Sequence, residues 1–118
     1  MMAVVGTLPA RSSDEAVACL GVYTKRLELH DGRPTYAKVD DENQLMMYDS
    51  CAAVWRLGRW LPLAYVQHTY LYGECDGGAM TPDKVNGAWR AWDGANFLAA
   101  PDVRLYAGPS AAPPPAAD

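Results

Sequence analysis

Residues 88–97 read Ala-Trp-Arg-Ala-Trp-Asp-Gly-Ala-Asn-Phe, and this stretch predicts two short strands joined by a tight turn. Asp93-Gly94 carries the turn signal, because a type I′ hairpin turn needs positive φ at both central residues, which aspartate tolerates and glycine adopts freely. Strict alternation places Trp89 and Trp92 on opposite faces of the strand. The stretch therefore predicts a β-hairpin whose aromatic side chains need a surface to pack against.

Short alternating runs and turn signals recur through the rest of the chain. Further strands are expected over residues 22–29, 35–39, 45–48, 53–57, 63–72 and 103–106. Turn signals separate them, as at Asp31-Gly32 and Thr81-Pro82, and Gly58 is expected to end the strand at 53–57. This spacing of strands and turns indicates an all-β fold, either a small antiparallel barrel or a two-layer sandwich.

A short helix is expected before the first of these strands. Ser12 or Ser13 can cap a helix over residues 14–20. Asp14 and Glu15 in its first turn favour the positive end of the helix dipole. The fold class therefore includes a short N-terminal helix.

The two ends of the chain differ in pattern from its centre. Residues 1–12 show no sustained period and predict a flexible leader, whereas residues 108–118 are rich in proline and alanine and predict a disordered tail. The expected organisation is one β domain over residues 13–107 between these ends.

The composition argues against several classes of partner. Half of the 118 residues are apolar and the formal net charge is −4, whereas nucleic-acid-binding proteins concentrate Lys and Arg to displace counterions. No apolar run approaches the roughly 20 residues of a membrane-spanning helix. The first residues lack the charged and apolar regions of a secretory signal. We therefore expect no nucleic-acid partner, no membrane partner and a cytoplasmic location.

The cysteines predict free thiols. Cys19, Cys51 and Cys75 are odd in number and widely spaced, with no Cys-x-x-Cys pair. A disulfide framework and a zinc ribbon both need paired or closely spaced cysteines. Free thiols in a reducing compartment fit this pattern.

The sequence carries no recognisable catalytic, metal or cofactor motif. His68, Glu74, Cys75 and Asp76 offer ligand atoms for a divalent metal, but their spacing matches no known ligand pattern. The acidic run 40–43 lacks the regular oxygen spacing of a calcium loop and predicts a solvated turn. We expect no catalytic residue, no metal site and no cofactor.

Aromatic residues are the most informative side chains. Four Trp and seven Tyr stand against one Phe, which favours rings that pack with one end and form hydrogen bonds with the other. Trp55 and Trp89 lie within alternating strands and are predicted core residues. Trp60 and Trp92 lie next to turns and are candidates for exposure. The predicted binding surface consists of Trp60, Trp92, Tyr65, Tyr70 and Tyr72.

A set of short motifs resembles a known type of module. The motifs are Gly21-x-Tyr23, Gly32-Arg33-Pro34-x-Tyr36, Val54-Trp55-Arg56-Leu57-Gly58, Thr81-Pro82-Asp83, Trp89-x-x-Trp92-Asp93-Gly94 and Ala100-Pro101-x-Val103-Arg104. Together they cover most of residues 21–106. This pattern is similar to an aromatic-rich β module found in algal and other protist proteins, often beside unrelated domains. The module has no established activity, so the resemblance implies an all-β interaction module and leaves its ligand open.

The expected function is non-catalytic binding of a protein partner through exposed aromatic side chains and an open strand edge. The first alternative is carbohydrate binding, in which the same Trp and Tyr rings stack on sugar rings. The second is a small enzyme of unrecognised type, which requires His68, Glu74 and Cys75 to converge in a pocket. The sequence leaves the oligomeric state open.

Overall fold

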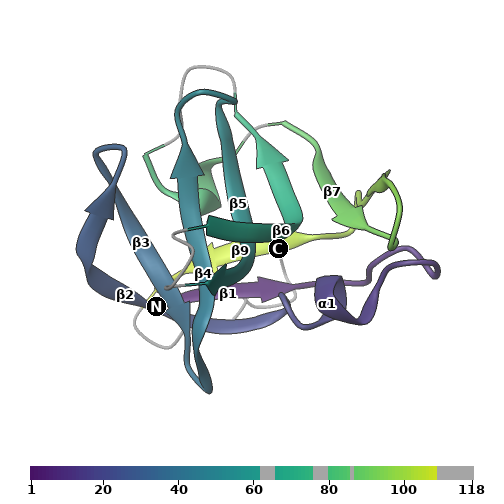
Figure 1. The fold of residues 1–118 in the computed structure, drawn as a ribbon, viewed down its shortest axis with the longest axis horizontal. Coiled ribbons are helices and arrows are strands. Elements are labelled where there is room, and N and C mark those ends of the chain that lie inside the picture. The colour runs from purple at the N-terminus through teal and green to yellow at the C-terminus, as the bar shows by residue number, and fades with distance from the viewer. Residues whose placement is uncertain (62–65, 76–79, 86, 109–118) are drawn as a thin grey trace, which may run out of the picture.

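In the described residues (1–61, 66–75, 80–85 and 87–108), nine antiparallel strands form one curled sheet, a half-barrel, with a short α-helix near the N-terminus (Figure 1). The structure is a computed structural model. The strands are β1 (Met2–Val5), β2 (Gly21–His30), β3 (Arg33–Lys38), β4 (Asp41–Asp49), β5 (Val54–Leu61), β6 (Val66–Glu74), β7 (Trp89–Trp92), β8 (Phe97–Ala99) and β9 (Arg104–Ala107). The helices are α1 (Asp14–Val17) and the 3-10 turn η1 (Pro82–Lys84).

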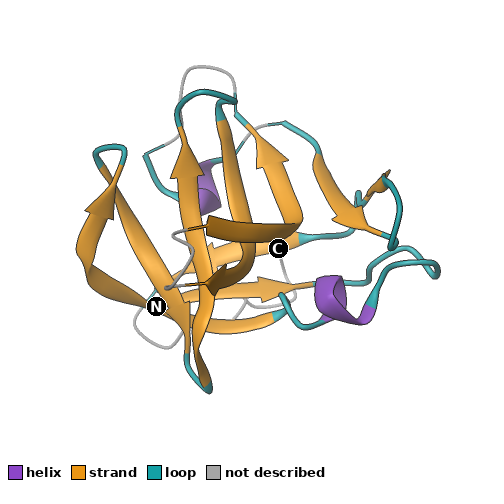
Figure 2. Ribbon diagram, in the orientation of Figure 1, coloured by secondary structure: helices purple, strands orange, loops and turns teal. Residues whose placement is uncertain are grey.

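The sheet is built from successive hairpins. Its strand order is β8-β7-β6-β5-β4-β3-β2-β1-β9. Each strand from β1 to β7 therefore pairs with the next strand in the sequence, and β9 returns to pair with β1. In Figure 2, β4 to β6 stand in front of β1 and β9, which cross behind them. The all-β class and the short helix are confirmed. The single curled sheet is a half-barrel, because β8 and β9 at its two edges do not pair within the described residues.

The prediction of a flexible leader over residues 1–12 is wrong for β1. Met2, Ala3 and Val4 are buried, and β1 pairs with β2 on one side and with β9 on the other. The sequence of a strand that is buried on both faces is a continuous apolar run without alternation. This run was too short to be recognised from its period.

The hairpin of β7 and β8 is confirmed, but its turn differs from the predicted type. Of the two central residues only Gly94 has positive φ, at 104°. The Asp93 Oδ1 accepts hydrogen bonds from the Asn96 and Ala95 backbone N–H groups at 2.6 and 2.7 Å, which holds the pKa of Asp93 below its ordinary value. The loop therefore has four residues and is closed by an aspartate side chain.

Asp31-Gly32 forms the two-residue turn with positive φ at both positions, 51° and 76°. It joins β2 to β3, whose flanking residues His30 and Arg33 pair directly. The turn prediction at Asp31-Gly32 is therefore confirmed, with the conformation that was expected at Asp93-Gly94.

Helix α1 is shorter than predicted and is held against the sheet at its two ends. Ser13 is its cap, since the Ser13 Oγ accepts the Ala16 N–H at 3.1 Å, and the Ser13 N–H donates to the Trp92 carbonyl at 2.7 Å. Past its C-terminal end, the Gln44 Nε2 donates to the Cys19 Sγ at 3.1 Å, and the Tyr23 hydroxyl donates to the Cys19 carbonyl.

The three cysteines are free thiols in very different surroundings, and we expect their reactivity to differ accordingly. Cys19 and Cys75 are buried, whereas Cys51 is exposed. Burial raises the pKa of the Cys19 thiol to about 12. At about pH 8, iodoacetamide should modify Cys51 in the folded chain and spare the other two, because alkylation needs an accessible thiolate. Mass spectrometry should show one adduct on the native chain and three after denaturation. Equal labelling of Cys19 and Cys51 in the native chain would contradict the packing of α1.

The core lies inside the curl of the sheet and confirms two predictions. Trp55 is fully buried, with its ring centroid 5.6 Å from that of Tyr48 and 6.4 Å from that of Tyr36. Trp89 is also buried, and its ring lies against Gly73 of the neighbouring strand so closely that a Cβ there would approach it to 2.7 Å. Both tryptophans are core residues, as alternation predicted.

Gly58 does not end its strand, contrary to prediction. Strand β5 continues through Gly58 to Leu61, and Tyr70 of β6 is left without a partner residue at a β-bulge beside it. A Cβ on Gly58 would lie 1.8 Å from the His68 carbonyl oxygen. Glycine is needed here because the two backbones approach closely at the bulge.

Candidate functional site

The outer face of the sheet, opposite the core, carries the candidate site. Trp55 points into the core, so its neighbour Arg56 points outward. Arg56 lies between Met47 of β4 and Tyr72 of β6, and Tyr72 lies between Arg56 and Arg90 of β7. Cross-strand pairing therefore places one tyrosine between two arginines on this face.

Three aromatic rings pack together beside this row, and we call them the outer aromatic cluster: Tyr72, Phe97 and Trp92. The ring centroids of Tyr72 and Phe97 are 4.8 Å apart with an interplanar angle of 79°. The Trp92 and Phe97 centroids are 5.0 Å apart with an angle of 56°. All three side chains are half-buried, so each has an exposed part. Edge-to-face packing holds the rings in place while leaving part of their surface to solvent.

Two ion pairs hold the arginines that flank Tyr72. Arg56 pairs with Asp49, and the Arg90 Nε lies 3.3 Å from the Glu74 Oε1. These side chains are between about one quarter and one half exposed. Ion pairs this exposed add little to stability. Their main effect is to fix where the guanidinium groups lie.

A cavity of about 520 Å³ opens on the same face, and we call it the outer pocket. Its lining consists of Ala52, Ala53, Val54, Arg56, Thr69, Tyr72, Glu74, Cys75 and Phe97. The volume lies within the range of about 300–1,000 Å³ that is usual for ligand pockets. The lining is mostly apolar and aromatic, with one cation and one carboxylate to orient a ligand.

Two local features of the outer pocket are unusual for a purely structural surface. Ala53 adopts a left-handed conformation with φ of 55°, and its carbonyl accepts the Cys75 N–H at 3.1 Å. The Thr69 Oγ1 is buried and has no hydrogen-bond partner within the described part of the chain. Backbone strain and unsatisfied buried hydroxyls are both more frequent at functional sites.

The structure divides the predicted binding surface. It brings Tyr72 and Trp92 together, but Tyr70, the bulged residue, packs against the core. Trp60 is half-buried and pairs with Gln67 of β6. Trp60 lies four residues along β5 from Arg56, or about 13 Å in an extended strand. Tyr65 lies outside the described residues.

Sequence reasoning missed Phe97 and the two arginines. Phe97 directly follows the turn and pairs with Trp92, so the hairpin register contained the signal. Arg56 and Arg90 meet Tyr72 only through the pairing of three strands, which no local pattern shows.

The cluster required by the enzyme hypothesis is not assembled. Glu74 and Cys75 line the outer pocket, but His68 does not. His68 lies six residues before Glu74 on β6, about 20 Å for an extended strand, and its ring contacts Tyr70. Asp76 lies outside the described residues. Over the described ranges, no group of three or more His, Cys, Asp and Glu side chains is placed to hold a metal ion.

None of the helices in the part of the chain that the structure describes has the length and apolar character to cross a membrane. Comparison with known proteins finds no matching family model, no matching curated protein and no matching solved structure.

Proposed function

We propose that this protein is a non-catalytic binding module that holds a protein partner on its outer face. The observation that carries the proposal is the outer pocket, where Tyr72 and Phe97 form one wall and Arg56 stands beside them. A partner side chain that enters this pocket would be desolvated against the aromatic rings. The ion pairs around it would form a polar rim.

This arrangement has the composition of a binding hot spot. Protein interfaces concentrate their binding energy in Trp, Tyr and Arg residues, which surround a pocket that excludes water. The outer aromatic cluster supplies the first two types, and Arg56 and Arg90 supply the third. The unpartnered Thr69 hydroxyl offers one hydrogen bond inside the pocket.

Carbohydrate binding is the second candidate function. Its support is the position of Glu74 and Arg90 beside the half-buried rings of Tyr72 and Trp92. Sugars are held by a flat apolar ring together with charged groups that bond their hydroxyls. Saturation transfer from sugar protons to the folded protein, lost in the Trp92→Ala variant, would favour this candidate over a protein partner.

Filling the outer pocket, or removing a ring of the outer aromatic cluster, should weaken partner binding without unfolding the chain. Ala52 is exposed at the pocket rim, so Ala52→Trp places a large ring in the cavity and removes no core contact. Trp92→Ala removes one ring of the outer aromatic cluster. Hot-spot changes of this kind weaken binding by about 2 kcal/mol or more, a factor of about 30. The measurement is affinity purification from the native lysate with the chain as bait, followed by titration of each retained protein.

Ala107→Trp is the matched control for this experiment. Ala107 is exposed on β9, at the opposite end of the strand order from β8, so the same new side chain is added away from the pocket. Partners should be retained by the wild type and by this control, and bound more weakly by both Ala52→Trp and Trp92→Ala. Equal retention by all four chains, with circular dichroism unchanged, would reject the outer pocket as the binding site.

A further inference from the structure

The outer edge of β2 is unpaired over most of its length. Strand β1 pairs with β2 only from Gly21 to Tyr23, whereas β2 continues to His30. Among the described residues, no strand pairs with β2 beyond Tyr23 on that side. In Figure 1 the hairpin of β2 and β3 stands at the margin of the molecule, away from β7 and β8. Unpaired strand edges present backbone donors and acceptors to other chains.

Two hydrogen bonds show which backbone groups point to this edge. The Val39 N–H donates to the Val22 carbonyl, and the Thr35 hydroxyl donates to the Glu28 carbonyl at 2.7 Å, so both carbonyls face β3. In an antiparallel sheet, successive residues turn their N–H and C=O groups to alternate sides. The backbone groups of Lys25, Leu27 and Leu29 therefore point away from β3.

A bulge in β2 interrupts its pairing with β3, but the Val22 carbonyl before the bulge and the Glu28 carbonyl at its end both face β3, so the alternation has the same phase at Lys25 and at Leu29. Lys25 pairs with Tyr36 and Leu29 pairs with Pro34, so residues 26–28 all oppose Thr35. Within the bulge the Arg26 Nη1 donates to the Thr35 hydroxyl at 3.3 Å.

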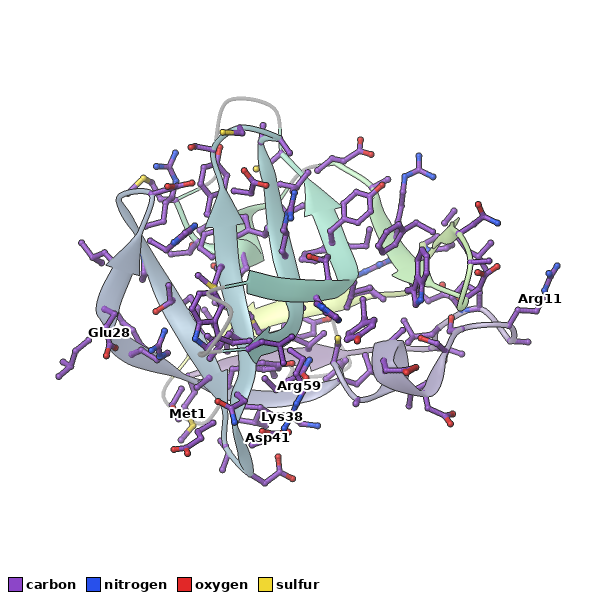
Figure 3. All side chains as sticks on the ribbon, in the orientation of Figure 1. Met1, Arg11, Glu28, Lys38, Asp41 and Arg59 are labelled. Atoms are coloured by element: carbon purple, nitrogen blue, oxygen red, sulfur yellow. The ribbon has the colours of Figure 1, made fainter. Side chains whose placement is uncertain are left out.

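Two leucines along this edge are exposed. Alternation predicts that Leu27 and Leu29 share a buried face with Tyr23, but only Tyr23 is buried, while Leu27 is 100% exposed and Leu29 65%. Arg26 and Glu28 lie on the other face, with their charged groups 3.6 Å apart. Figure 3 shows Glu28 at the outer margin of the hairpin. Open edges are usually protected by charged residues such as lysine, by proline or by short length. Lys25 is such a residue here, whereas the exposed Leu27 and Leu29 are not.

We propose that this edge pairs with the same edge of a second copy of the chain, antiparallel and about a two-fold axis through Leu27. In that register Leu27 faces Leu27 of the second copy, and Lys25 faces Leu29, so every outward backbone group finds a partner. Arg26 then faces Glu28 of the second copy on both sides of the axis. The registers centred on Arg26 or on Glu28 place like charges opposite each other, which is unfavourable. The charge pattern of this edge is therefore self-complementary.

Charge reversal tests the register directly. Arg26→Glu and Glu28→Arg each place like charges opposite one another at both flanking positions, so each variant alone should dimerise at least about tenfold more weakly than the wild type. An equimolar mixture of the two variants should recover dimerisation, because opposite charges face each other again in the heterodimer. Sedimentation equilibrium from about 10 μM to about 1 mM measures the dissociation constants of the wild type, of each variant and of the mixture.

Leu27→Asp provides a second variant that leaves the bulge intact. Leu27 is fully exposed, so this substitution changes little in a single chain, but it places two carboxylates together at the two-fold axis. Val39→Asp is the matched control, since Val39 is 62% exposed and lies outside the edge. Leu27→Asp should abolish the dimer, and Val39→Asp should leave it unchanged.

Three results would overturn the proposal. The first is a wild-type chain that stays monomeric up to about 1 mM. The second is a dimer that persists in both charge-reversal variants and in Leu27→Asp, which would place the contact elsewhere. The third is a hydrogen-exchange result in which the Lys25, Leu27 and Leu29 amides of the chain alone stay unprotected at every concentration and become protected only when an unrelated extended peptide is added. The edge would then bind a peptide and not a second copy of the chain.

Discussion

Gly58→Ala is expected to lower the free energy of unfolding by about 3 kcal/mol or more, which is a large part of the 5–15 kcal/mol that a domain usually has. The added Cβ would lie 1.8 Å from the His68 carbonyl oxygen and 2.9 Å from the Thr69 Cα. Both are backbone atoms, so no side-chain rotation relieves the clash. Strands β5 and β6 would have to separate at the bulge. Urea unfolding followed by tryptophan fluorescence measures the change.

Alanine substitutions at two other glycines are controls that separate the effect of the backbone clash from the effect of adding a side chain. Gly108 has open space around its Cβ position and no positive φ, so Gly108→Ala should change stability by less than about 0.5 kcal/mol. Gly32 also has open space but has φ of 76°, so Gly32→Ala should destabilise by about 1 kcal/mol. Unfolding of Gly58→Ala at the same urea concentration as Gly108→Ala would contradict the close approach of the β5 and β6 backbones at Gly58.

Trp55→Ala is expected to destabilise the fold by about 4 kcal/mol. Trp55 is fully buried and packs between Tyr36 and Tyr48, so its removal leaves a cavity that these rings cannot fill without leaving their own contacts. The lost burial and the cavity both contribute to the loss of stability. Thermal unfolding followed by circular dichroism gives the difference from the wild type.

Trp92→Ala is the natural comparison, because it makes the same chemical change at a half-buried position. The Trp92 ring contacts Phe97 on the outer face and keeps part of its surface in solvent. Its removal should cost about 1–2 kcal/mol. Equal destabilisation by the two substitutions would contradict the assignment of Trp55 to the core and Trp92 to the outer aromatic cluster. The comparison also shows whether Trp92→Ala is folded in the binding experiment.

The proposed binding site and the proposed dimer edge lie on different strands of the sheet. The outer pocket is built from the β4–β5 turn and from β5, β6 and β8, whereas the dimer edge belongs to β2. Pocket variants should therefore leave the oligomeric state unchanged. If both proposals hold, a dimer presents two outer pockets, and binding to a partner with repeated sites would gain from avidity.

Local signals in the sequence determined the elements that depend only on near neighbours. The turn at Asp31-Gly32 follows from two residues that accept positive φ, and the start of α1 follows from the Ser13 cap. Alternation assigned Trp55 and Trp89 to the core, because a strand turns successive side chains to opposite faces. These features could be predicted because turn, cap and alternation each act over a few residues.

The tertiary structure alone decided the features that need a partner from far along the chain. Strand β1 forms because β2 and β9 pair with it on both sides, although its own sequence has no strand period. Strand β5 continues through Gly58 because the bulge in the neighbouring strand β6 lies beside this residue. The outer pocket exists because Arg56, Tyr72 and Phe97 meet across separate strands. The physical reason is that cross-strand register is set by the pairing of whole strands and by the curl of the sheet, and neither is encoded in any single stretch of the chain.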